Sequence, residues 1–344
     1  MPVTAGPARR GDLPIYLSGL GSVVAFNTVT LKSRVDGTLD KIAFREGQFV
    51  HDGDLLAEID PRPFQVQLEQ AEGQMARDEA TLAIAKTDLA RYQILFQQDS
   101  IAKQQLDTQV GTVAQLEGAV KADQAVIDNA RLQLTYCRIT APISGRIGLR
   151  LVDAGNIVHA NDQSGLLVIT QVHPIAVVFT IPEDQLPSVL KRLRTGERLP
   201  VEAYDRSGDT KIATGYLLTV DNQIDATTGT SRLKAVFDNE DNALFPNQFV
   251  NVRLLLDVDR GTVIVPVVAI QRGPKGTFVY VVKADQTVEV RPVTVGPMEG
   301  NDASIKDGVA AGDLVVVDGL DKLRAGSAVS LETAGSSRGR KQGP

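Results

Sequence analysis

The pattern of hydrophobic and polar positions changes twice along the chain. Residues 13–60 alternate in short β-type runs that glycines interrupt at turn positions. From Pro63 to about Gln98 only one glycine occurs, and Ala, Gln, Glu and Leu dominate, a composition that favours helix. After Tyr136 the β-type runs return and continue to the end, with one helical-looking piece at 183–193. The pattern predicts a mainly β protein with a long helical insertion.

Inside the insertion, small and apolar residues recur at steps that indicate a coiled-coil seam. A break at residues 97–100 separates two such seams, which predicts an antiparallel helical hairpin on the order of 50 Å long. The alternative is a pair of helices inside a bundle, but the sequence offers no third or fourth amphipathic helix nearby. The first seam comprises Leu68, Ala71, Met75, Asp78 (its one polar member), Leu82, Ala85, Leu89, Tyr92 and Phe96, and the second comprises Leu106, Val113, Val120, Ile127 and Leu134.

The segments that flank the insertion resemble each other. One reads VDGTLDKIAFREGQFVHDGDLL (35–56) and the other ISGRIGLRLVDAGNIVHANDQSGLL (143–167). Glycine permits a positive φ where short strands reverse sharply, so we expect turn positions at the matching glycines. A repeated β-unit that cannot bury its face alone predicts two halves packed as a sandwich about a pseudo-twofold axis. The matching pairs are Gly37 with Gly145 and Gly47 with Gly155.

Composition and charge exclude several classes of function. A formal net charge of −6 leaves no basic stripe to neutralise phosphates, so no nucleic-acid partner is expected. The single cysteine, Cys137, excludes an internal disulfide and a Cys-based zinc site, and a buried thiol is expected. No run approaches the roughly 20 apolar residues of a membrane helix. The start of the chain also lacks an apolar signal core, so an exported form would have lost its targeting segment.

Candidate chemistry is sparse. His51 and His159 occupy equivalent repeat positions and could face each other at a metal site, but ordinary surface turns fit a pair without supporting ligands better. The run Gly19-Leu20-Gly21 starts like a dinucleotide fingerprint, yet the third glycine is missing, which favours a strand-linking turn. Metalloprotease, P-loop and nucleophile-elbow motifs are also missing. We therefore expect neither a metal site nor enzymatic activity.

The flanking segments resemble the two half-motifs of a biotinyl/lipoyl domain. In carrier proteins of that fold, a Lys at the turn between the halves bears the cofactor. Here residues 62–136 replace the turn and no such Lys can be assigned, so no cofactor is expected. A lipoyl domain interrupted by a helical hairpin is the signature of periplasmic adaptor, or membrane fusion, proteins. The matching segments are EIDPRPFQVQLEQAE (58–72), YCRITAPISGRIG (136–148), the barrel motif at 222–254, PVVAIQ (266–271) and GDLVVVDGLDKLRAGSAV (312–329).

The segment at 222–254 is most similar to MdtA-type adaptors of resistance-nodulation-division (RND) pumps. That resemblance implies a hexameric sleeve in the periplasm, associated with the inner membrane through a missing N-terminal segment. It would link an RND proton-driven multidrug transporter to a TolC-like outer-membrane channel. It also implies nested domains. Their expected ranges are 1–19 and 263–333 (membrane-proximal β-domain), 20–31 and 171–262 (β-barrel), 32–61 and 138–170 (lipoyl-like sandwich), 62–137 (hairpin) and 334–344 (disordered tail).

At the hairpin tip, family members carry an Arg, a Leu four residues later and a Ser seven after that, and these residues meet the outer-membrane channel. Arg91 and Leu95 match this pattern, whereas Ala102 replaces the Ser. Without the family pattern, Arg91 reads as a solvated helix residue and Leu95 as part of the seam. Because Asp99 and Ser100 stand just upstream, we expect one of them to cap the second helix, with Ala102 inside its first turn.

Two other functions stay open at this point. The chain could be the adaptor of an ABC-type or type I secretion exporter, from which the sequence is separated only by its subtype resemblance. In a different class, it could be a biotin- or lipoate-carrying enzyme subunit. The sequence does not name the exported substrates.

Overall fold

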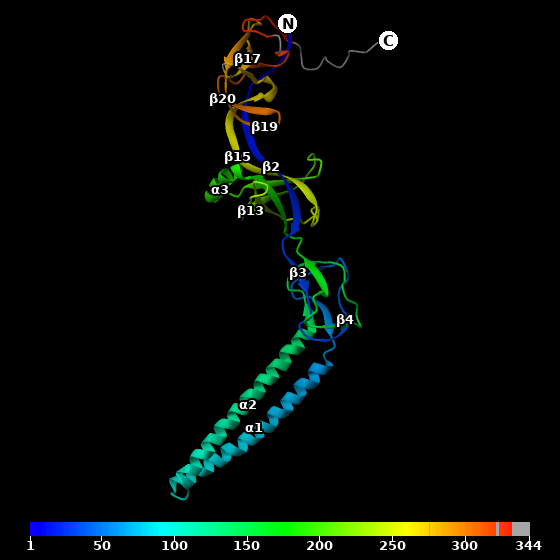
Figure 1. Ribbon diagram of the computed structural model, residues 1–344, viewed down its shortest axis with the longest axis vertical. Helices are drawn as coiled ribbons and strands as arrows, with labels where there is room; N and C mark the ends of the chain where they lie inside the picture. Colours follow the sequence, from blue (N-terminus) through cyan, green and yellow to red (C-terminus); the bar gives the residue numbers. More distant parts are fainter. Residues whose placement is uncertain (275, 321–322, 332–344) are drawn as a thin grey trace. The chain divides into compact units, whose positions relative to one another are not determined.

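The computed structural model describes residues 1–274, 276–320 and 323–331 (Figure 1). The tail expected at 334–344 lies outside these residues. The chain divides into two units, one formed by residues 25–173 and the other by residues 1–24 with 174–344. The expected fold class, mainly β with a long helical hairpin, is confirmed. Among the helices of the described residues, none has the length and apolarity needed to cross a membrane.

The unit at 25–173 contains a β-sandwich that has the predicted pseudo-twofold symmetry. The repeat matches β3 with β7, β4 with β8, β5 with β9 and β6 with β10, and this exchange converts the order β3-β10-β8-β5 of one sheet into the order β7-β6-β4-β9 of the other. Both sheets contribute to one core, in which Leu56, Ile59, Leu167 and Ile169 are fully buried. The strands are β3 (Thr28–Leu31), β4 (Gly37–Ile42), β5 (Phe49–Val50), β6 (Leu55–Ile59), β7 (Arg138–Thr140), β8 (Gly145–Ile147), β9 (Ile157–Val158) and β10 (Leu167–Thr170).

The four repeat glycines serve two different purposes. Gly47 and Gly155 have φ angles of +75° and +90°, which confirms their prediction as turn positions. The same expectation is wrong for Gly37 and Gly145, which begin strands β4 and β8 with ordinary φ angles. There a Cβ would lie 2.6 Å from Ile59 Cγ2 in the first case and 2.7 Å from the Thr170 carbonyl oxygen in the second. These two glycines are required by the close approach of the neighbouring strand in the same sheet, β6 for Gly37 and β10 for Gly145.

The helical hairpin leaves the sandwich between β6 and β7. Its helices are α1 (Arg62–Gln97) and α2 (Lys103–Cys137), which lie side by side and antiparallel (Figure 1). The seam predicted from the heptads lies on the face that packs, because its members Ala71, Ala85, Val113 and Ile127 are buried. Ala130, which is also buried, lies three residues after Ile127 and was not among the predicted members. The thiol of Cys137 closes the seam at the sandwich end, and burial raises its pKa.

Polar contacts between the two helices fix their register. The Gln109 side-chain amide donates to the Ala85 carbonyl oxygen (2.8 Å). Ion pairs join Lys86 to Glu117 (2.8 Å) and Arg131 to Glu72 (3.2 Å). These pairs are about half exposed, so each contributes little stability by itself.

In the second unit, pairing of β12 with β15 closes six strands into a barrel in the order β12-β13-β14-β11-β2-β15. The boundary expected at residue 19 falls inside β2, which runs unbroken along β15. The run Gly19-Leu20-Gly21 is therefore part of a strand and not the expected turn. Glycine is needed at position 19 because a Cβ there would collide with the Thr180 carbonyl of β11. The barrel strands are β2 (Arg9–Ala25), β11 (Ile175–Pro182), β12 (Pro200–Tyr204), β13 (Lys211–Asp225), β14 (Thr230–Phe237) and β15 (Phe249–Pro266).

The helical-looking piece after Pro182 is a 3-10 turn followed by α3 (Leu186–Arg194), which buries Val189. Beyond the barrel, β15 pairs with β20, and a separate sheet has the order β16-β17-β21-β1-β22, with β18 paired to β17. Both faces of β17 are buried, because Val279 and Val281 enter one core and Tyr280 enters another. The strands are β1 (Pro2–Pro7), β16 (Gln271–Gly273), β17 (Gly276–Val282), β18 (Val288–Pro292), β19 (Thr294–Glu299), β20 (Asp302–Asp307), β21 (Leu314–Asp318) and β22 (Ser330–Leu331).

Candidate docking site at the hairpin tip

The end of α1 is a Schellman motif built on Asp99. The Asp99 backbone has φ +53°, in the left-handed region. Its N–H donates to the Phe96 carbonyl (3.0 Å), and the N–H of Ser100 donates to the Leu95 carbonyl (2.9 Å). These are the two bonds that satisfy the last carbonyls of a helix before the chain turns. Glycine is the usual residue at the left-handed position, so the sequence gives a weak signal for this turn.

The predicted cap of α2 is wrong. Ala102 is itself the N-cap residue, with extended backbone angles (φ −75°, ψ 144°), and it has no polar side-chain atom to accept a bond. Asp99 and Ser100 are held in the end of α1, and the Ser100 hydroxyl donates to the Gln98 carbonyl (3.2 Å). They cannot also cap α2. The helix α2 therefore begins later than expected, and the loop is longer on the α2 side than the hydroxyl and carboxyl groups upstream suggest.

Restoring a hydroxyl at the cap should therefore stabilise the hairpin. In Ala102→Ser the side chain can accept a bond from the N–H of Gln105, and the Gln105 side chain can reach back, which is a capping box. We expect the free energy of unfolding to rise by about 1 kcal/mol, measured by thermal unfolding followed through the helical circular dichroism signal. Ala114→Ser, an exposed change inside α2, is the matched control and should cost a few tenths of a kcal/mol. A melting temperature for Ala102→Ser at or below that of the control would contradict the cap assignment.

The surface of the tip is apolar on the α1 side. Ile94 is 56% exposed, and Tyr92, Leu95 and Phe96 are each 36–37% exposed. Adjacent exposed apolar side chains of this size at a helix end form an apolar patch, which is typical of a protein interaction site. Tyr92 and Phe96 continue the seam in register, but at this end of the hairpin they are only partly covered.

The predicted docking residues do not form one cluster of contacts. Arg91 and Leu95 lie one turn apart on the same face of α1, and Arg91 pairs with Asp88 of its own helix (3.1 Å). Ser100 is tied to Leu95 by a backbone bond, and Ala102 lies at the start of the other helix. Sequence reasoning missed Ile94. Its exposure follows from a heptad position outside the seam, so the heptad pattern itself contained the signal.

The two histidines of the repeat lie in equivalent turns. In each turn the backbone N–H of the histidine donates to the side-chain carboxylate of an Asp three residues later, His51 to Asp54 (2.8 Å) and His159 to Asp162 (2.9 Å). The His51 ring packs against Phe49, with 5.7 Å between ring centroids. Among the described residues, no group of three or more His, Cys, Asp or Glu side chains is placed to hold a metal ion.

Comparison with known proteins identifies the family. The chain is 51% identical over 333 residues to the multidrug resistance protein MdtA of Cronobacter turicensis, covering 97% of this chain and 80% of that protein. It is 52% identical over 336 residues to the protein of the same name from Yersinia pseudotuberculosis, covering 96% and 76%. The chain belongs to the RND membrane fusion proteins. It is an RND multidrug efflux adaptor of the MdtA type, as the sequence motifs predicted.

Family models place three domains of RND membrane fusion proteins along the adaptor. They are the barrel-sandwich hybrid domain at 27–170, the β-barrel domain at 174–258 and the C-terminal permuted SH3 domain at 261–322. Among solved structures, MacA from Actinobacillus actinomycetemcomitans has a TM-score of 0.60 at 19% identity, covering 91% of the adaptor and 98% of MacA. A MacA–MexA chimera with the Pseudomonas aeruginosa MexA α-hairpin domain has the same TM-score at 22% identity, covering 90% and 98%. These structural likenesses concern the fold.

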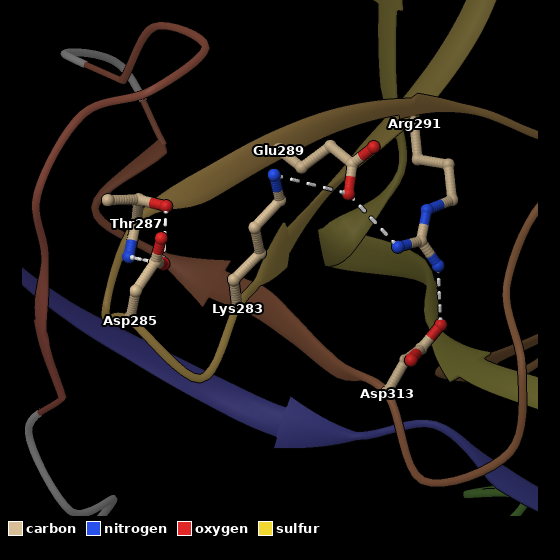
Figure 2. Close-up of polar contacts among 6 residues, drawn as sticks. All are labelled: Lys283, Asp285, Thr287, Glu289, Arg291 and Asp313. Carbon is tan, nitrogen blue, oxygen red and sulfur yellow. Dashed lines mark hydrogen bonds and ion pairs between the residues drawn. The ribbon is translucent and has the colours of Figure 1, made fainter.

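The permuted SH3 domain of the adaptor contains a chain of charged contacts (Figure 2). Arg291 on β18 lies between Glu289 (3.1 Å) and Asp313 (2.7 Å), and Lys283 approaches Glu289 from the end of β17 (4.0 Å). The hydrogen bond to Glu289 and the charges of both carboxylates raise the pKa of Arg291. Asp313 also accepts from the N–H of Ala310 (2.9 Å). The network holds β18 to the loop before β21, a structural role.

Proposed function

We propose that this membrane fusion protein is the periplasmic adaptor between an inner-membrane RND proton-driven transporter and a TolC-like outer-membrane channel. It works by contact and transmitted motion, without catalysis and without a cofactor. The observation that carries the proposal is the exposed apolar tip of a long hairpin in an RND membrane fusion protein. A helix of 36 residues is about 54 Å long, so the hairpin places its tip far from the sandwich.

The docking site we propose comprises Arg91, Leu95, Ser100 and Ala102, widened by Ile94. Leu95 and Ile94 supply apolar area, and the Arg91 side chain is 70% exposed and free to exchange its weak pair with Asp88 for a partner's carboxylate. Ser100 and Ala102 contribute shape. The loop of five residues between the helices keeps this surface small.

The barrel and the permuted SH3 domain are the proposed contacts with the transporter, and copies of the chain are proposed to assemble as a hexamer. The proposed location is the periplasm, in association with the inner membrane. Because the relatives are named multidrug resistance proteins, chemically diverse drugs are the proposed cargo.

Complementation tests the proposal. The chain is expressed behind an export signal in cells whose MdtA-type adaptor gene has been deleted but whose transporter and channel remain. We expect drug resistance to return to the level of the parent cells. Unchanged drug sensitivity, with the chain folded and present in the periplasm, would contradict the proposed function.

A further inference from the structure

The seam of the hairpin contains one polar layer made of two aspartates. Asp78 of α1 follows Met75 by three residues, and Asp123 of α2 follows Val120 by three residues, so both stand at seam positions. Neither side chain is fully exposed, and that of Asp78 is 23% exposed. The layers on either side are apolar. Two carboxyl groups from opposite helices therefore face each other where a coiled coil normally packs hydrocarbon.

The two carboxyl groups have very different surroundings. Asp78 Oδ2 accepts a bond from the side-chain amide of Gln74 (3.0 Å), and Asp78 Oδ1 lies 3.3 Å from Nε of Arg77. Asp123 Oδ2 is buried and has no hydrogen-bond partner among the described residues. Donors thus stabilise the charge of Asp78, whereas one oxygen of Asp123 is buried without a donor, which is costly for a carboxylate.

These surroundings favour a proton on Asp123. Partial burial raises the pKa of Asp123, and the negative charge and nearby carboxyl group of Asp78 raise it further. Arg77 is the charged group that acts in the opposite direction, but its side chain is 70% exposed and its charge is screened by solvent. A protonated Asp123 can donate its hydroxyl hydrogen to a carboxylate oxygen of Asp78, which would join the two helices across the seam.

We propose that this pair makes the hairpin sensitive to pH. A proton shared by Asp78 and Asp123 joins the two helices at low pH, and its loss as the pH rises leaves two facing carboxylates that loosen the middle of the hairpin. The device does not depend on the identity of the docking partners.

The direction of the effect follows from proton linkage. An aspartate has a pKa of about 3.9 in an unfolded chain, and that of Asp123 is raised in the folded protein. Between these two values the folded protein binds more protons than the unfolded chain, so stability falls as pH rises. The stabilisation is complete below the unfolded value and is lost as pH rises through the folded value.

Hydrogen exchange followed by mass spectrometry on the full chain tests the proposal. Protection of the peptides that contain residues 75–82 and 120–127 is compared at about pH 4 and about pH 8, after correction for the intrinsic exchange rate. The lower value is close to the ordinary pKa of an aspartate, and the higher value is far above it. We expect several-fold higher protection at the lower pH in the unmodified chain. Asp123→Asn keeps the shape without the charge, so it should be protected at both pH values.

Two further variants make the outcome specific. Asp107→Asn removes an exposed charge from the same helix and should behave like the unmodified chain. Asp78→Asn removes the other carboxylate of the layer, and it should also abolish the difference between the two pH values. Equal protection of the unmodified chain at both pH values, or lower protection of Asp123→Asn than of the unmodified chain at the higher pH, would overturn the proposal.

Discussion

Leu95→Ser at the hairpin tip is expected to abolish drug resistance while the protein stays folded. Leu95 is 36% exposed and lies beside the seam, next to the seam residue Phe96, so its loss removes little buried area within the chain. In a docked complex the same side chain would be enclosed by the channel. Apolar anchors enclosed at an interface contribute on the order of 2 kcal/mol or more, and a serine hydroxyl there would be left without a partner.

The resistance assay is the complementation described above, with circular dichroism as the check on folding. Ile84→Ser is the matched control, because Ile84 is 65% exposed on the same helix but three turns from the tip. We expect the control to retain resistance. If Leu95→Ser also retains full resistance, the position is not a docking contact. If it loses its helical signal, Leu95 belongs to the seam alone.

Gly145→Ala is expected to destabilise the sandwich more than the same substitution at the turn glycine Gly155. The added Cβ would lie 2.7 Å from the Thr170 carbonyl oxygen and 3.0 Å from Ile169 Cγ2. A carbonyl in the neighbouring strand β10 cannot swing aside as a flexible side chain can, so the strands must separate. Such overpacking costs about 2–3 kcal/mol.

Gly155→Ala provides the contrast. Its Cβ would meet no other heavy atom of the described residues within 4 Å, so only the positive φ of 90° is unfavourable. That strain is worth about 1 kcal/mol. Calorimetric unfolding of both variants gives the comparison. Equal losses of stability would show that the approach of β8 to β10 is looser than described.

The sequence predicted the hairpin and the repeat correctly because both depend on patterns along the chain. Heptad steps specify which face of α1 and α2 packs, and this face is the buried one. A repeated β-unit specifies a twofold partner, and the two sheets exchange their strand order as expected. In each case one face of the element is buried, and this burial requires apolar residues at a regular spacing that can be recognised in the sequence.

The errors concern contacts between segments far apart in sequence. Gly37 and Gly145 are required by neighbours more than twenty residues away, and Gly19 by a strand that follows it by about 160 residues. Turn geometry at Asp99 was hidden because an aspartate stands where a glycine is usual. A seam defined only by steps of seven omits Asp123, which lies three residues after Val120 at the alternate seam position of α2.

The most direct test of the account is to identify what the chain binds in cells. The tagged chain is purified with its membrane partners after mild cross-linking, and the partners are identified by mass spectrometry, with Leu95→Ser as a parallel sample. The account predicts that an inner-membrane RND transporter copurifies with both forms, whereas a TolC-like outer-membrane channel copurifies only with the unmodified chain. Recovery of an ABC transporter in place of an RND transporter, or of equal channel with both forms, would contradict it.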